Sequence, residues 1–355
     1  MKKIGKYEIV REIGQGATSN VYLGRDPFAQ RDVAVKVVFP QVLKDPERGK
    51  LYTHLFLNEA SLVGKLNHPH IVQIFDAVVA DSLCYIVMEY VPGGTLEAFC
   101  AEHKLLPVSR VVEIIFKCTR ALDFANRLGI THRDIKPANI LIVGGDAQTG
   151  DIKISDFGAA ITGGADRTQV SGIGSPAYMS PQQVKEQPLD HRTDIYSLGV
   201  VMYQLLTGLL PFQASNNYNM VYQIINTVPT PVGHLRKDLP PTLDAIVSKA
   251  MAKELEDRYQ SWADFAHDLA QAFRNKEVKA PTREFADSEK FDTLRALPFF
   301  GDFSDVEIWE VVRFSEWQNV EPGAEIMKDG EPGDFFCFLA EGELKVTKNG
   351  KILNL

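Results

Sequence analysis

The stretch THRDIKPANIL, residues 131–141, carries three polar side chains of complementary chemistry at Asp134, Lys136 and Asn139. The stretch KISDFG, beginning at residue 153, follows a short hairpin and adds Asp156. Mg²⁺ prefers carboxylate and amide oxygens, a transferred phosphoryl group needs positive charge around it, and the incoming hydroxyl needs an in-line acceptor. Any one of these residues could satisfy backbone groups in a turn. The ordered set predicts phosphoryl transfer.

Lys36 lies within the apolar stretch DVAVKVV, which reads as a strand. Because side chains alternate along a strand, Ala34, Lys36 and Val38 share one face. Taken alone, a lysine at such a position more often extends to solvent from an exposed edge.

Glu59 argues for a pairing role of that lysine. The stretch at about residues 54–66 is typical of a helix, and Glu59 is the one charged member of a stripe that includes Leu62 and Leu66. A carboxylate on a buried stripe costs several kcal/mol unless a cation meets it, and Lys36 is a suitable cation. From these residues alone, a catalytic pair and a merely structural pair are equally acceptable.

The stretch IGQGATSNVYLG, residues 13–24, opens like a phosphate-binding loop. Gly14 and Gly16 fit the G-x-G-x-x-G pattern, but Ser19 stands where the third glycine belongs. Alone, this stretch could equally be a hairpin turn that binds nothing.

The order of predicted elements indicates two halves. Residues 7 to about 90 read mainly as strands with one helix, and helical patterns follow from Ser109, which can cap a helix that ends before Gly129. A second apolar helix ends at Gly208. A sheet-rich half followed by a helical half leaves a cleft where small ligands bind.

Together these motifs resemble the eukaryotic-type protein kinase superfamily, and most closely its bacterial serine/threonine kinases, over about Tyr7 to Phe273. The resemblance implies an α+β, bilobal fold with a kinase domain at residues 1–275, ATP and Mg²⁺ as cofactors, and proteins with Ser or Thr acceptors as substrates. A cytoplasmic location is expected. In this family the third glycine of the loop is the most replaceable.

The resemblance also implies a role for each matching position. Lys36, oriented by Glu59, would hold the α- and β-phosphates, Asp134 would accept the proton of the substrate hydroxyl, and Lys136 would steady the γ-phosphate. Asn139 and Asp156 would bind Mg²⁺, and Asp194 resembles the buried aspartate that anchors the catalytic loop. The remaining ATP-binding positions are Ile13, Gly14, Gly16, Val21, Ala34, the gatekeeper Met88, and the hinge residues Glu89 and Val91.

Gln182 is a departure from the family pattern, because Ser-Pro-Gln stands where Ala-Pro-Glu is usual. The usual glutamate pairs with an arginine, here expected at Arg258, so we expect a looser contact in the helical half. The hairpin turn VGGDAQTGD is also a few residues longer than usual, which costs little. Since no catalytic position is altered, the sequence argues against a pseudokinase. Lys136, with Ser175, favours serine and threonine over tyrosine acceptors.

The segment from Asp156 to Gln182 is expected to carry regulatory phosphorylation. Arg133 precedes the catalytic aspartate, and in this family that arginine meets a phosphate on the segment. Thr168 and Ser171 are the expected acceptors, which predicts autophosphorylation.

The C-terminal part differs in texture. A charged linker is predicted at residues 276–290, and residues 291–355 resemble the first half of a cyclic-nucleotide-binding domain, a partial β-roll. Ser304 and Glu307 form a capping box, and Asn349-Gly350 fits a hairpin turn. A generic small β appendage is the alternative. The chain stops at Leu355, before the segment that would grip the cyclic phosphate, so cyclic nucleotide would bind only if the full domain is present. Open strand edges make homodimerisation possible.

Bulk properties exclude some classes of function. The chain has 355 residues and a net charge of −8, which argues against nucleic-acid binding. The longest apolar run is too short to span a membrane, and four widely separated cysteines predict no disulfide frame or metal site. The rival from another class is a cyclic-nucleotide-responsive signalling scaffold whose kinase domain binds ATP but is weakly active.

Overall fold

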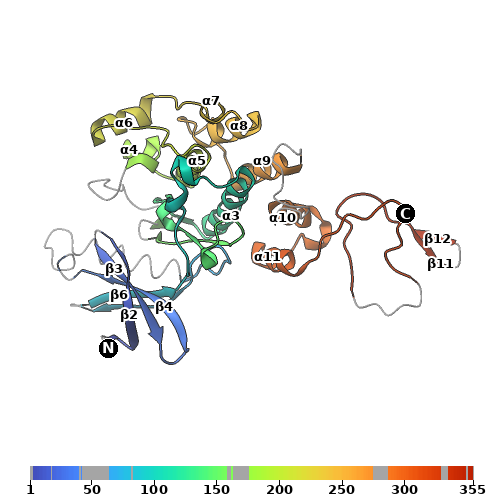
Figure 1. The fold of residues 1–355 in the computed structure, drawn as a ribbon, viewed down its shortest axis with the longest axis horizontal. Helices are drawn as coiled ribbons and strands as arrows, with labels where there is room; N and C mark the ends of the chain where they lie inside the picture. The colour runs from blue at the N-terminus through green and yellow to red at the C-terminus, as the bar shows by residue number, and fades with distance from the viewer. Residues whose placement is uncertain are drawn as a thin grey trace. The chain divides into compact units, whose positions relative to one another are not determined.

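The structure is a computed structural model that describes residues 3–16, 18–39, 41, 64–80, 83–157, 161–162, 176–274, 287–328, 335–348 and 351–354. The chain divides into two compact units, Met1–Pro281 and Thr282–Leu355 (Figure 1). Of the predicted functional residues, Glu59, Thr168, Ser171 and Ser175 lie outside the described residues. No helix in the described parts of the chain is both long and apolar enough to cross a bilayer.

The larger unit begins with a six-stranded sheet in the spatial order β1-β2-β3-β4-β6-β5. Every neighbouring pair is antiparallel. The strands are β1 (Lys3–Ile4), β2 (Tyr7–Gln15), β3 (Ser19–Asp26), β4 (Arg31–Val38), β5 (Ile74–Ala80) and β6 (Leu83–Glu89). The strands predicted around the glycine-rich stretch, Lys36 and Met88 are therefore confirmed.

Side-chain alternation gives this sheet two apolar faces. One face carries the buried core residues Tyr7, Val33, Val35, Tyr85 and Val87. The other face carries Val38, Cys84 and Ile86. Lys36 is two residues before Val38 on β4 and therefore shares the second face, so its side chain emerges from an otherwise apolar layer.

The rest of the larger unit is mainly helical, as predicted (Figure 1). Its helices are α3 (Val108–Arg127), α4 (Pro181–Val184), α5 (Arg192–Thr207), α6 (Asn217–Asn226), α7 (Val232–Leu235), α8 (Pro241–Ala250) and α9 (Trp262–Arg274). Short 3₁₀ turns are η1 (Leu96–Phe99), η2 (Glu102–Lys104), η3 (Pro137–Asn139), η4 (Val143–Gly145) and η6 (Pro176–Tyr178). The small strands are β7 (Ile130–Thr131), β8 (Ile140–Ile142), β9 (Ile152–Ile154) and β10 (Ile161–Thr162). The α5 helix is almost wholly buried, so it is the central helix of this lobe.

The predicted ends of these helices were partly wrong. The N-cap of α3 is Pro107, and Ser109 lies buried in the first turn. Proline suits this place because a helix start has no use for its missing N–H. The other end is as predicted, since Gly129 follows the cap residue with a φ of +76°. Gly208 likewise caps α5 with a φ of +77°.

Most of the helix predicted at about residues 54–66 lies outside the described residues, so that helix stays a prediction. Gly64 and Lys65 form a turn, and Leu66 has no regular structure although its side chain is buried. The burial of Leu66 therefore does not depend on its being part of a helix.

The β8–β9 hairpin lies beside the segments that lead into and out of the sheet. Near β5, the Val72 N–H donates to the Ile154 carbonyl over 2.9 Å, and the Ile154 N–H donates to the His70 carbonyl over 2.9 Å. Beyond β6, the Gly144 N–H donates to the Pro92 carbonyl over 2.7 Å. The hairpin therefore contacts both segments through its backbone.

The long turn of this hairpin is anchored rather than loose. The buried Arg110 of α3 donates from Nε to the Ala147 carbonyl over 2.9 Å and from Nη2 to the Gly150 carbonyl. At the end of the turn, Asp151 pairs with His70 and Lys117 at 3.0 and 3.2 Å. The extra residues thus gain specific contacts that offset their entropic cost.

The smaller unit contains α10 (Asp287–Ala296), η7 (Pro298–Phe300), α11 (Asp305–Phe314), β11 (Val346–Lys348) and β12 (Lys351–Asn354). The capping box of Ser304 and Glu307 is confirmed at the start of α11. The two helices pack through Phe291 and Trp309, whose ring centroids are 4.7 Å apart. Their second link is an ion pair from Arg295 to Asp305.

A β-roll is not confirmed in this unit. Among the described residues after α11, only β11 and β12 are strands, and they pair with each other in one antiparallel hairpin. The described residues between 315 and 345 contain no regular strand. The prediction rested on the resemblance of residues 291–355 to a cyclic-nucleotide-binding domain, and turn signals in that stretch do not by themselves supply the partner strands that a sheet needs.

Candidate active site

Asp134, Lys136 and Asn139 converge in the loop between β7 and β8, as the sequence predicted. The Lys136 ammonium lies 2.7 Å from Asp134 Oδ2. The Asn139 amide nitrogen donates to the same carboxylate oxygen over 3.1 Å and to the Asp134 carbonyl over 2.8 Å. These bonds restrict the Asp134 side chain to one orientation while leaving it 39% exposed, so a second reactant can reach it.

Lys36 and Asp156 come together although they lie 120 residues apart in the sequence. The Lys36 ammonium on β4 lies 2.6 Å from Asp156 Oδ1. This ammonium lowers the pKa of the Asp156 carboxyl, an effect that burial opposes and that His132 and Lys136 reinforce. Asp156 is therefore ionised at neutral pH. Its φ of +65° is uncommon for a residue other than glycine, and such conformations persist where neighbouring contacts over-determine them.

His132 and Ser155 connect the two acidic residues. The Asp134 N–H donates to His132 Nδ1 over 3.2 Å, which leaves Nε2 to donate to the Ser155 carbonyl at 3.1 Å. The Ser155 N–H donates to the Asn139 carbonyl over 2.9 Å. Sequence reasoning missed both residues, although His132 and Ser155 lie inside the two quoted motifs, where their positions were the available signal.

Asp194, at the start of α5, holds the backbone of the loop. Its two carboxylate oxygens accept the N–H groups of His132 and Arg133, each over 2.7 Å. Burial raises the pKa of Asp194, although the two N–H bonds and the neighbouring cations oppose the shift. Arg133 has a φ of +68°, so these bonds stabilise a strained conformation immediately before Asp134. The predicted anchoring by Asp194 is confirmed.

The sheet brings the predicted adenine-covering positions into register. Val21 on β3 lies opposite Lys36, and Ala34 on β4 lies opposite Met88 on β6. Ala34 is buried, and its small side chain leaves room beside the lysine. Glu89 is the last residue of β6, and Val91 lies on the connection to the helical half.

The glycine-rich turn starts as the motif suggests. Ile13 and Gly14 lie on β2, where Gly14 pairs with Val21, and the Gly16 N–H donates to the Ser19 carbonyl over 2.8 Å. Ser19, which replaces the third glycine, is itself buried at the start of β3. A serine is therefore accommodated there without a left-handed backbone.

One ion pair at this site could not be foreseen. Lys153 on β9 pairs with the Glu89 carboxylate at 2.9 Å, so the connection between the halves is tied to the hairpin that precedes Asp156. Lysine and glutamate are common surface residues, and no spacing in the sequence marks these two as partners.

Gln182 contacts Arg258 as predicted, but the contact is not loose. The buried Arg258 donates to Gln182 Oε1 over 3.1 Å, and Gln182 Nε2 donates to the Lys253 carbonyl over 3.1 Å. Arg258 also donates to the carbonyls of Ala252 and Arg192. An amide can both accept and donate, so it makes one bond that the usual glutamate could not.

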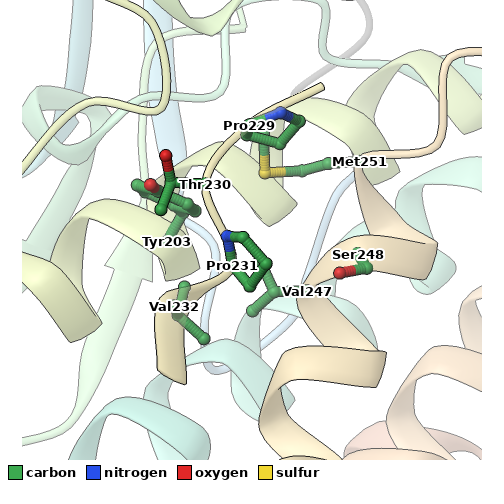
Figure 2. Close-up of a pocket in the computed structure, with 8 residues that line it drawn as sticks. All are labelled: Tyr203, Pro229, Thr230, Pro231, Val232, Val247, Ser248 and Met251. Carbon is green, nitrogen blue, oxygen red and sulfur yellow. The ribbon is translucent and has the colours of Figure 1, made fainter. Parts of the chain in front are cut away.

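A small surface pocket lies elsewhere in the helical half, between α5, α8 and the segment Pro229–Val232 (Figure 2). Its lining includes Tyr203, Val247 and Met251. None of the predicted site residues lines it, and its lining offers no charged group with which to bind a phosphate.

Comparison with known proteins agrees with this geometry. The family described as "Protein kinase domain" matches residues 7–272. The chain is 38% identical over 301 residues to "Serine/threonine-protein kinase PknB" of Mycolicibacterium smegmatis, covering 82% of this chain and 47% of that protein. It is 38% identical over 283 residues to the protein of the same name from Mycobacterium leprae, covering 78% and 44%. A "Probable serine/threonine-protein kinase PknB" of Corynebacterium glutamicum is also 38% identical, over 282 residues, covering 76% and 42%. The chain thus spans less than half the length of these relatives.

Proposed function

The chain belongs to the protein kinase family and contains a serine/threonine kinase domain, and we propose that the site around Asp134 transfers the γ-phosphoryl group of ATP to serine and threonine hydroxyls of proteins. The observation that carries the proposal is the convergence of two pairs, Lys36 with Asp156 and Lys136 with Asp134, at 2.6 and 2.7 Å. Phosphoryl transfer depends on positioning and on charge more than on covalent chemistry, and these pairs supply both.

Asp134 is the acceptor for the proton of the substrate hydroxyl. Its carboxylate is partly exposed and is oriented by Asn139 and Lys136. The Lys136 ammonium is at the same time a source of positive charge for the phosphoryl group in transit. Lys36, 15% exposed on its strand, holds the remaining phosphates.

The donor set of the site fits Mg²⁺. Asp156 offers an ionised carboxylate, and because the Asn139 amide nitrogen faces Asp134, the amide oxygen is the atom available to a cation. Both are hard oxygen ligands of the kind that Mg²⁺ prefers. When bound, Mg²⁺ supplies charge neutralisation for the phosphate oxygens.

In this proposal the adenine ring lies between β3, β4 and the connection beyond β6. Val21 and Ala34 cover its face, Met88 limits the depth of the site, and the backbone groups of Glu89 and Val91 bond its edge. The register of β3, β4 and β6 supports this assignment, since it aligns these residues with Lys36.

The test is phosphate transfer from radiolabelled ATP to a generic basic protein. Wild-type protein should phosphorylate it, whereas Asp134→Asn and Asp156→Ala should lower kcat by roughly a hundredfold or more with the fold intact. Asp238→Asn is a matched control, because Asp238 is an exposed aspartate paired with Arg236 at 3.1 Å. Transfer by Asp156→Ala at the wild-type rate would refute the mechanism.

We also propose that the chain autophosphorylates at Thr168 or Ser171. Arg133 supports this, because it is a cation directly before the catalytic aspartate, and a phosphate could gain charge-assisted bonds there. Mass spectrometry after incubation with ATP should find phosphate on one of these residues. Full activity without either phosphate would contradict the proposal.

For residues 291–355 we propose a regulatory role in a cytoplasmic enzyme. The β11–β12 hairpin supports pairing with further strands, because one hairpin alone leaves two open edges. Those edges would serve in a homodimer or in a completed cyclic-nucleotide-binding domain. Calorimetric titration with cAMP and cGMP is the test, and we expect no micromolar binding by these 355 residues. Tight binding without phosphate transfer would favour the scaffold instead.

A further inference from the structure

Gln183 is a buried glutamine at the start of α4 with no role in the mechanism above. Its backbone N–H donates to Ser180 Oγ over 3.2 Å, and its side-chain Oε1 accepts the Ser180 N–H over 2.9 Å. These two bonds form a capping box, a motif in which glutamate and glutamine serve equally well. Capping therefore uses only the oxygen of the side-chain amide.

The nitrogen of the same amide contacts the catalytic loop. Gln183 Nε2 donates to the Arg133 carbonyl over 2.9 Å, across fifty residues of sequence. That carbonyl belongs to the peptide group whose N–H is that of Asp134. The preceding peptide is held from the other side, since the Arg133 N–H donates to Asp194 over 2.7 Å. The strained Arg133 is thus bonded through both its N–H and its carbonyl.

We propose that Gln183 is a positioning residue for the catalytic base, because it fixes the peptide group that carries Asp134. This inference rests on the proposed function of Asp134. It accounts for a glutamine at a position where capping alone would accept glutamate, since only the amide can also donate to the Arg133 carbonyl.

The bond also connects the catalytic base to the segment that precedes α4. Tyr178 in that segment donates from its hydroxyl to Gln204 Oε1 over 2.7 Å, and Ser197 Oγ donates to the Tyr178 carbonyl over 2.8 Å. Residues 176–184 are therefore hydrogen-bonded to α5, and Gln183 connects the same segment to the catalytic loop. Loosening of this segment would release one of the restraints on Asp134.

The test is the isosteric variant Gln183→Glu, which keeps the capping acceptor but replaces the donor with a carboxylate that faces a carbonyl. We expect kcat to fall about tenfold with the KM for ATP unchanged, because one buried hydrogen bond is lost and an acceptor is left unsatisfied. The deficit should shrink as the pH is lowered, since a protonated carboxyl can donate again. A purely structural role would not produce this pH dependence.

The control is Gln223→Glu in α6, which breaks an exposed bond between the same two chemical groups, from Nε2 to the Gln213 carbonyl over 3.0 Å. It should leave kcat within about twofold of wild type. If the glutamate variant does not fold, Gln183→Met fills a similar volume without a donor, and because it also removes the capping acceptor its kcat should fall at least about tenfold.

Hydrogen exchange of residues 131–139 separates this inference from the proposed function. The amides of Arg133 and Asp134 should exchange faster in Gln183→Glu than in the control, whether or not the protein phosphorylates anything. If wild-type protein is inactive, the proposed function fails, and exchange still decides the role of Gln183. Unchanged exchange, or a kcat equal to that of the control, would overturn the inference.

Discussion

Replacing Asp194 should disable the site without touching a residue that contacts the reactants. The carboxylate is 2% exposed and accepts two backbone N–H groups, each at 2.7 Å. Asp194→Ala leaves both donors buried and unsatisfied, at about 1–3 kcal/mol each. The expected loss is therefore roughly 2–6 kcal/mol in the free energy of unfolding, or about 5–20 °C in Tm for a domain of this size.

The same variant should lower kcat by about a hundredfold. Without the two bonds, Arg133 can relax from its φ of +68°, and Asp134 moves with it. A displacement of about 1 Å at a catalytic group is enough for such a loss. Asp194→Asn should have a smaller effect on Tm, because it keeps one acceptor and removes a buried charge whose pKa is raised by its burial.

The assay pairs thermal unfolding with initial rates of phosphate transfer on the folded protein. Leu198→Ala is the control, since Leu198 is fully buried on the same helix and its truncation costs about 2–5 kcal/mol without removing an acceptor. Leu198→Ala should lower Tm about as much as Asp194→Ala does, but its kcat should stay within a fewfold of the wild-type value. An equal loss of kcat in both variants, or a wild-type Tm in Asp194→Ala, would refute the reasoning.

Two further predictions concern the contacts around Arg258. Burial, with a smaller contribution from Arg258, lowers the pKa of Lys253 to about 8, so the unfolded state binds more protons above that pH and stability should rise from pH 8 toward the ordinary lysine pKa. Chemical denaturation on either side of pH 8 should show this rise in the free energy of unfolding in wild type and not in Lys253→Met. An equal dependence of that free energy on pH in both proteins would contradict the prediction. Gln182→Glu should raise Tm by about 2–4 °C, because an ion pair with the buried guanidinium gains about 1 kcal/mol more than the lost amide bond costs. Scanning calorimetry is the measurement, and a lower Tm would show that the bond to the Lys253 carbonyl matters more.

The sequence predicted those parts of the site that local chemistry determines. Lys36 was placed by strand alternation, and Asp134, Asn139 and Asp156 by their order along the chain. Their close approach follows from the fold of the family rather than from any local spacing. Asp156 is a partner of Lys36. Glu59 lies outside the described residues, so the predicted pair with Glu59 stays a prediction.

Contacts between distant segments could not be predicted in the same way. The bond from Gln183 to Arg133 and the pair of Lys153 with Glu89 each join residues far apart in sequence. Polar side chains have many possible partners, and only the packed backbone selects one. The start of α3 was misplaced for a related reason, since serine is a common cap but the backbone turns at Pro107. In the described part of the chain after α11 only one hairpin forms, so turn signals alone do not define a sheet.

The β8–β9 hairpin has a mechanical consequence. Its backbone is bonded to His70 and Val72 just before β5, and to Pro92 beyond β6. The hairpin is therefore attached at two separate places, one on each side of the β5–β6 pair in the sequence. Sliding the sheet across the helical half would stretch all of these bonds at once, together with the ion pair between Lys153 of the hairpin and Glu89 at the end of β6. The hairpin therefore resists a shear that would move Lys36 away from Asp156, which lies two residues beyond β9.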